Sequence, residues 1–234
     1  MAKKSSFWKW LDPYYYLDLF LVNVFGDAKD TKTKIIHWIF YIAYSFLLAY
    51  LIYLLFSLIL GVSMPFATVV SGSMEPVLHR GDIVILGSPK SLNAIVVDFN
   101  EDIRNRNLNE YIKFNYVVNN YGLEQVDSLV IGDNVVDISQ IYDNDVVVYY
   151  SNLTKKPIIH RIVVQINAND GNFILTKGDN FKTNRTVDQD CIIDKYGNVS
   201  NCLHVYAIPE DLVVGKKIGK IPYLGYIKLF LFGN

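Results

Sequence analysis

The sequence is poor in cysteine, in histidine and in net charge. Its 234 residues include only two cysteines, Cys191 and Cys202, and four histidines, and 22 basic side chains nearly balance 23 acidic ones. Two cysteines are too few for a disulfide framework and lack the spacing of a metal site, so we expect neither metal nor cofactor. A single bridge between them is left open for a compartment outside the cytosol. The balanced charge gives no reason to expect a nucleic-acid partner.

One stretch, residues 35–60, contains no Asp, Glu, Lys or Arg over 26 positions. As a helix it would reach about 39 Å, more than the hydrocarbon core of about 30 Å, so it is expected to span a membrane with some tilt. Lys29, Lys32 and Lys34 lie just before it, and the first charged residue after it is Glu75. The positive-inside rule therefore predicts a single-pass protein with a cytosolic N-terminus and all later residues outside the cytosol.

The two ends of the chain are apolar but too short to cross a membrane. Residues 1–34 form an N-terminal segment whose aromatic stretch, 7–25, is expected to be a helix lying in the membrane interface. No small-residue cleavage site follows this stretch, so it does not resemble a cleavable signal peptide. The interrupted apolar tail, 221–234, is expected to touch the outer membrane face or to pack beside the anchor.

Residues 61–234 show the short, branched and alternating runs of a β domain. These runs are separated by Gly, Asn, Asp and Pro, and no long helical pattern alternates with them, which predicts a mainly β, antiparallel domain. An Asn-rich stretch of weaker pattern, 88–144, is interpreted as an inserted subdomain. The expected strands cover residues 82–86, 145–150, 158–166, 173–175 and 212–214.

The segment Ser71-Gly72-Ser73-Met74-Glu75-Pro76 follows the predicted anchor closely. Gly72 permits backbone angles closed to other residues, and Pro76 restricts the chain before it. Such a turn can hold one serine hydroxyl outward as a nucleophile, provided that a base lies elsewhere in the chain. The alternative is a structural loop leaving a membrane helix.

The four histidines offer few bases for this serine. His37 lies at the cytosolic end of the anchor, His79 is expected on a loop surface, and His204 lies near the cysteines. His160 stands within a predicted strand, where alternation aims it at one face of the sheet. On pattern alone, a strand histidine is more often structural than catalytic.

Lysines are rival bases, because a buried lysine with a lowered pKa can activate serine. Lys155 and Lys156 precede a proline, and Lys177 precedes a turn of sequence Gly-Asp-Asn. Aspartates that follow, Asp179, Asp188 and Asp190, are the carboxylates available to orient a base, although Asp is also an ordinary turn residue.

Five segments in one order resemble the boxes of the type I signal peptidases. The resemblance covers the anchor and most of residues 60–227, with 88–144 and about 191–208 standing as insertions. The matching segments are residues 71–82, 145–149, 159–163, 177–180 and 215–225.

The resemblance also indicates a branch of that family. Bacterial members carry a lysine before the arginine of the third box, whereas this chain has His160 before Arg161. That feature is similar to the archaeal and endoplasmic-reticulum branch, which uses Ser, His and Asp. It implies Ser73 as nucleophile and His160 as general base, with the Ser73 N–H and the Ser71 hydroxyl stabilising the oxyanion.

The carboxylate is the point where the chain departs from the family pattern. In that branch a second aspartate follows the first by about six residues, but Arg185 stands there, and the later aspartates come after extra residues. We favour Asp188 as the residue that orients His160, with Asp179 supporting and Asp190 in reserve.

The resemblance implies a membrane-anchored serine endopeptidase that removes signal peptides from secreted preproteins at the cell or endoplasmic-reticulum membrane. Its partners would be those preproteins, the lipid bilayer, and either the secretion machinery or partner subunits. Extended substrate is expected to pair near Val69, Val70, Asp82, Ile83 and Val84. The alternatives are a related self-cleaving serine peptidase and a non-catalytic, membrane-anchored interaction module.

Three sequons, at Asn152, Asn184 and Asn198, fall on the predicted outer side. They are consistent with glycosylation in an archaeal or eukaryotic setting.

Overall fold

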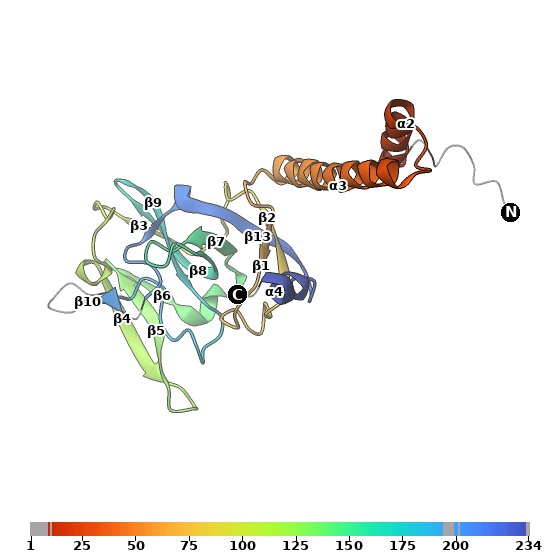
Figure 1. The fold of residues 1–234 in the computed structure, drawn as a ribbon. Helices are drawn as coiled ribbons and strands as arrows, with labels where there is room; N and C mark the ends of the chain where they lie inside the picture. The colour runs from red at the N-terminus through yellow and green to blue at the C-terminus, as the bar shows by residue number, and fades with distance from the viewer. Residues whose placement is uncertain (1–8, 10, 194–198, 201, 233–234) are drawn as a thin grey trace. The chain divides into compact units, whose positions relative to one another are not determined.

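The computed structural model describes residue 9 and residues 11–193, 199–200 and 202–232. It divides into two compact units between Phe56 and Ser57. The first holds α2, Pro13–Phe25, and most of α3, Thr31–Leu60, and the second holds all the described strands (Figure 1). The sequon at Asn198 lies outside the described residues.

Helix α2 starts and stops at residues suited to those positions. The Asp12 carboxylate accepts a hydrogen bond from the Tyr14 N–H at 2.9 Å, and Pro13 occupies the first turn, where a missing N–H costs nothing. Gly26 ends the helix at a φ of 81°, which a residue with a Cβ rarely adopts.

Aromatic and polar side chains join α2 to α3. The Tyr14 and Ser45 hydroxyls lie 2.7 Å apart, and the Tyr41 hydroxyl donates to Asp18 at 2.6 Å. Among the described residues, α3 is the helix long and apolar enough to cross a membrane. It starts four residues before the predicted span, because its polar first turn is capped by Asp30, whose carboxylate accepts from the N–H groups of residues 32 and 33.

An eight-stranded sheet forms the centre of the second unit, in the order β1-β2-β13-β7-β8-β9-β12, with β3 beside β8. Its pairs are antiparallel except β3 with β8, so the predicted mainly β, antiparallel fold is confirmed. The strands are β1 Phe66–Thr68, β2 Ile83–Gly87, β3 Val96–Phe99, β7 Val146–Tyr150, β8 Pro157–Ala168, β9 Gly171–Lys177, β12 Ile208–Pro209 and β13 Val213–Ile221.

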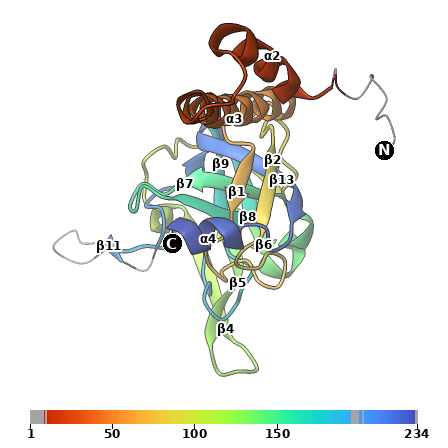
Figure 2. The ribbon, with the colours of Figure 1, turned by 45° about the vertical axis from the view of Figure 1, so that its right-hand side comes forward.

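The stretch of weak pattern contains a second sheet, which we call the arm: β4 Ile112–Val118, β5 Glu124–Ile131 and β6 Asn134–Asp137. In both ribbon views β4 and β5 project from the main sheet as a long hairpin (Figures 1 and 2). The base of the arm shares a hydrophobic core with β8 and β9. That core includes Ile112, Leu129, Ile131, Ile166 and Phe173, all buried.

Two smaller features complete the unit. Strands β10, Ile192–Ile193, and β11, Val199–Ser200, form a ribbon closed by a disulfide between Cys191 and Cys202, the bridge that the sequence had left open. Near the C-terminus, α4, Tyr226–Phe232, leaves Phe230 and other apolar side chains exposed. Its contact with a membrane stays a prediction.

Shortening Leu129, which is fully buried, should destabilise the second unit as a whole. Because the arm and the main sheet share its core, Leu129→Ala is expected to cost about 2–5 kcal/mol and to lower one common unfolding midpoint. Thermal unfolding of the full-length chain in detergent, followed by circular dichroism, measures this. The matched control is Val118→Ala, at an exposed position of the same arm. An arm that melted in a separate transition would contradict the shared core.

Candidate active site

The serine turn is held by two buried apolar side chains four residues apart. Met74 and Leu78 pack into a core with Val84 and Val148, and the Leu78 N–H donates to the Met74 carbonyl at 2.9 Å. This anchoring leaves the Ser73 side chain partly exposed at the surface of the domain.

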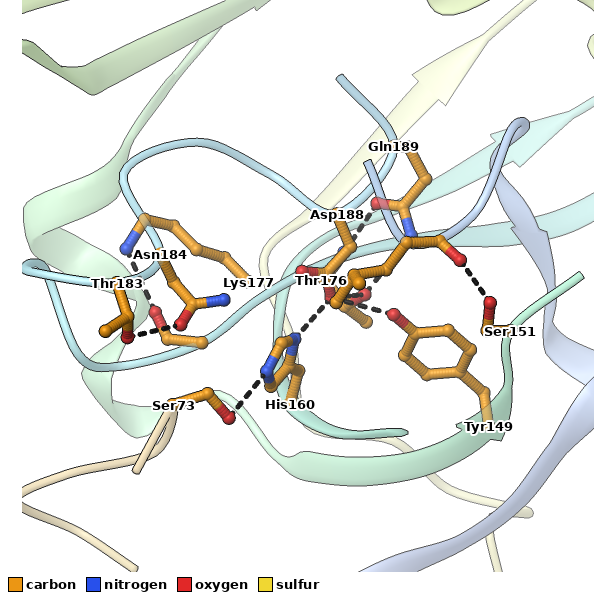
Figure 3. Close-up of polar contacts among 12 residues, drawn as sticks. Ser73, Tyr149, Ser151, His160, Thr176, Lys177, Thr183, Asn184, Asp188 and Gln189 are labelled. Atoms are coloured by element: carbon orange, nitrogen blue, oxygen red, sulfur yellow. Dashed lines mark hydrogen bonds and ion pairs between the residues drawn. The ribbon is translucent and has the colours of Figure 1, made fainter. Parts of the chain in front are cut away.

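His160 reaches this serine from β8. In the register of β7 and β8 it lies opposite Val147, so it shares a sheet face with Tyr149, two residues further along β7. Its side chain is almost completely buried, and its Nε2 lies 3.0 Å from the Ser73 Oγ (Figure 3). The two residues are 87 positions apart in the chain.

Asp188 stands behind the histidine. Its Oδ2 lies 2.6 Å from His160 Nδ1 and also accepts hydrogen bonds from the Tyr149 hydroxyl at 2.8 Å and the Thr176 hydroxyl at 2.7 Å (Figure 3). Because a carboxylate only accepts, the ring proton belongs on Nδ1, and the lone pair of Nε2 faces Ser73.

The backbone around Asp188 is fixed as firmly as its side chain. Its N–H donates to the Thr176 carbonyl at 2.8 Å, and its carbonyl accepts from the Leu203 and His204 N–H groups at 2.7 and 3.1 Å. Gln189 accepts from the Thr176 N–H at 3.0 Å. Burial and the neighbouring Asp188 carboxylate raise the pKa of Tyr149 well above its usual range, so its phenol remains a donor.

The other two candidate carboxylates have different partners. Asp179 forms a buried, two-pronged ion pair with Arg161, at 2.8 Å from its Nε and 2.9 Å from its Nη2. Asp190 accepts from the hydroxyls of Tyr116 and Thr186. The described contacts therefore bring Asp188 to His160 and place Asp179 and Asp190 elsewhere.

Lys177 follows Thr176 directly on β9, so alternation turns its side chain to the opposite face of the sheet. Its Nζ donates to the Gly178 carbonyl at 3.0 Å, and burial lowers its pKa. His204 is also buried, and its Nδ1 donates to the Tyr206 carbonyl at 2.8 Å. Burial lowers the pKa of His204 as well.

The turn after β9 docks on the serine turn. The side chain of Asn180 donates to the Gly72 carbonyl at 2.8 Å, and its N–H donates to the Ser73 carbonyl at 2.9 Å. A Cβ on Gly178 would lie 2.6 Å from the Ser73 carbonyl oxygen, so this close approach requires glycine.

Two of the residues predicted to bind substrate lie inside the sheet. Ile83 and Val84 are paired with β1 on one side and β13 on the other, which leaves their backbone no free edge. The Val69 backbone is hydrogen-bonded to Gly81 and Asp82. This corrects that part of the prediction, and the exposed edge runs along β1 towards Val70, whose side chain is 47% exposed.

Asp82, also predicted at the substrate site, instead holds chain segments together. Its carboxylate accepts from the His79 N–H at 3.1 Å, from Lys220 Nζ at 3.2 Å and from the Tyr223 N–H at 3.3 Å. Burial favours a raised pKa for Asp82, but these hydrogen bonds outweigh it and hold the pKa below its usual range.

Sequence reasoning missed the partners of Asp188 and of the serine turn, namely Tyr149, Thr176, Gln189 and Asn180. Tyr149 and Thr176 meet Asp188 through the register of β7, β8 and β9, and Asn180 and Gln189 through the path of the irregular segment after β9. Local pattern within one sequence does not reveal which strands pair or where such a segment returns. Among the described residues, no group of three or more His, Cys, Asp or Glu side chains is placed to hold a metal ion.

Comparisons with known proteins agree with this geometry. No protein-family model matches the chain. A signal peptidase complex catalytic subunit, SEC11, from Plasmodium falciparum is 25% identical over 221 residues, which cover 94% of this chain and 85% of the relative. SEC11 from Saccharomyces cerevisiae strain YJM789 is 28% identical over 171 residues, covering 73% and 67%. The homologues of this chain are therefore catalytic subunits of the eukaryotic signal peptidase complex, to which it is similar over most of its length.

Proposed function

We propose that this protein is a membrane-anchored serine endopeptidase that removes signal peptides, with Ser73 as nucleophile, His160 as general base and Asp188 as the residue that orients the base. The observation that carries the assignment is the continuous hydrogen-bonded chain from Ser73 Oγ through both ring nitrogens of His160 to the Asp188 carboxylate. The protein's relatives are named as catalytic subunits of signal peptidase.

In the first step, the Ser73 Oγ attacks the scissile carbonyl carbon while Nε2 of His160 takes the hydroxyl proton. The imidazolium that forms is stabilised by the buried Asp188 carboxylate. Collapse of the tetrahedral intermediate breaks the C–N bond, and His160 returns the proton to the leaving amine. The signal peptide is left as an acyl ester on Ser73.

The second step reverses these roles. His160 removes a proton from water, the hydroxide attacks the ester, and Ser73 recovers its proton as the signal peptide leaves. We assign the Ser73 N–H and the Ser71 hydroxyl to the oxyanion. The Ser71 Oγ lies 3.2 Å from the Ser73 Oγ, close enough to reach an oxygen that forms beside it. Loss of one such donor typically costs about 10²–10³ in rate.

The substrate is expected to add to the free edge of β1. Directly after β1, the Val69 backbone bonds inward to Gly81 and Asp82, just before β2, so the N–H and C=O groups of Thr68 and Val70 point outward by alternation. Ser73 follows the last residue of α3 by thirteen positions. A nucleophile so close to the anchor is kept near the membrane that holds its substrate, which raises their effective concentration.

We place the catalytic unit outside the cytosol, at the endoplasmic reticulum. Two features support this topology, the lysines before α3 and the disulfide between Cys191 and Cys202, because such bonds persist in oxidising compartments. The relatives are named as subunits of a complex, and we propose that this chain also assembles with partner subunits in addition to binding preproteins.

Removing the nucleophile or the base should abolish cleavage without unfolding the chain. Ser73→Ala and His160→Ala are each expected to lower kcat by about 10⁴-fold or more. Cleavage of a radiolabelled preprotein by the full-length enzyme in detergent measures this loss. Lys177→Met serves as the control and should retain activity within about tenfold, because Lys177 occupies the opposite sheet face. Retained activity in His160→Ala together with loss in Lys177→Met would identify the lysine as the base.

Three aspartate-to-asparagine variants separate the carboxylates. Asp188→Asn should lower kcat by about 10³–10⁴-fold, because an amide in that place can donate to the ring and favour the wrong tautomer. Asp190→Asn should lower kcat far less than Asp188→Asn, because Asp190 accepts from Tyr116 and Thr186 and not from the histidine. Asp179→Asn should act through stability, because it leaves buried Arg161 without a counter-charge, and is expected to lower the unfolding midpoint more than kcat. An Asp179→Asn variant that is stable but inactive would refute this division of roles.

A further inference from the structure

The segment from Gly178 to Asp190 contacts both ends of the hydrogen-bonded series Ser73–His160–Asp188. Near its start, Asn180 holds the backbone of the Ser73 turn, and near its end Asp188 holds His160. No helix or strand is formed over these residues, so regular backbone pairing does not fix the intervening residues 181–187. Something else must order them if both ends are to stay in place.

Hydrogen bonds from the arm fix the middle and the end of this segment. The Val126 N–H on β5 donates to the Arg185 carbonyl at 2.8 Å. The Tyr116 hydroxyl on β4 donates to the Asp190 carboxylate, and burial together with this bond raises the pKa of Tyr116 to about 12. In both ribbon views the chain after β9 runs beside β4 and β5 (Figures 1 and 2).

The tip of the arm makes a separate contact. The ring of Tyr121 stacks on that of Phe181, with centroids 5.4 Å apart and planes 23° apart. Tyr121 is 72% exposed and adds little to any core, so its ring is placed to hold Phe181 rather than to stabilise the fold. Phe181 follows Asn180 directly. The Tyr121–Phe181 stack therefore lies next to the residue that is hydrogen-bonded to the serine turn.

The arm and the segment are joined by these bridges and are not packed along their whole length. A cavity of about 680 Å³ lies between them, lined by Tyr116 and Glu124 of the arm and by residues 183–188 and 190 of the segment, with Ile192, Cys202 and Leu203 beyond. Beside this cavity, Val187 of the segment is buried in the core that the arm shares with β8 and β9. The bridges therefore act together with this one core side chain, and each of them should matter for the position of residues 181–186.

We propose that the arm positions the catalytic residues. By holding the segment 178–190 in place, it lets Asn180 and Asp188 keep Ser73 and His160 at the distance and orientation that catalysis requires. The inference rests on the proposed function. A misplacement of reacting groups by about 1 Å can cost about a hundredfold in rate, so a clamp outside the site affects turnover without touching substrate. Tyr116, Tyr121 and Phe181 are then positioning residues.

A double-mutant cycle on the stacked pair tests the clamp. In the full-length enzyme, Tyr121→Ala and Phe181→Ala should each lower kcat by about threefold to tenfold with KM within about twofold, and the double variant should be no worse than the single ones. Tyr116→Phe, which removes only the hydroxyl, should lower kcat in the same way. The matched control is Tyr142→Ala, which removes a tyrosine side chain that is 68% exposed and lies outside the arm and the segment.

Amide hydrogen exchange of the same proteins separates this inference from the proposed function. The arm variants should exchange faster within residues 178–190 while the strands of the main sheet and the unfolding midpoint stay as in the wild type. Faster local exchange supports the clamp even if the wild-type chain cleaves no preprotein, an outcome that would refute only the proposed function. Unchanged exchange in that segment, a kcat equal to that of Tyr142→Ala, or a change confined to KM would overturn the clamp.

Discussion

One oxygen atom of Asp188 receives hydrogen bonds from three neighbouring strands: from Tyr149 on β7, from His160 on β8 and from Thr176 on β9. In a nearly dry site this carboxylate would be costly without such donors, and with them it is fixed in direction. The position of the imidazole therefore follows from the register of three strands. The histidine becomes a base because the sheet holds it between a buried acceptor and an exposed hydroxyl.

The nucleophile belongs to a different part of the domain. Met74 and Leu78 fix its turn in a core under β2 and β7, while the base and carboxylate depend on the opposite side of β8 and β9. The two halves meet through the turn that follows β9, where Asn180 binds the serine backbone and Gly178 allows the close approach. Lys177, the last residue of β9, points to the other face of the sheet, which separates this site from one based on lysine.

Local signals were sufficient to predict the β class and the strands β2, β7, β8 and β9, because alternation and branched side chains act within a few residues. Of β13 they predicted only the start, within residues 212–214, because Gly215, Lys216 and Gly219 have little strand preference and pairing with β2 and β7 overrides it. The strands of the arm were not predicted either, because the pattern in their stretch of sequence is weak. At the site, Ser73, His160 and Asp188 came from the family resemblance, whereas Tyr149 and Thr176 required the register.

The segment after β9 is longer here than the family pattern implies, and Arg185 stands where the second aspartate would be expected. Its carbonyl is the acceptor for Val126 of the arm, itself within a stretch that looks inserted. Two departures from the family pattern, about 60 positions apart in the chain, thus meet at one hydrogen bond. If both are insertions, as the resemblance predicts, the hairpin and the loop form a matched pair. In a chimera with a shorter relative, the two would have to be exchanged together.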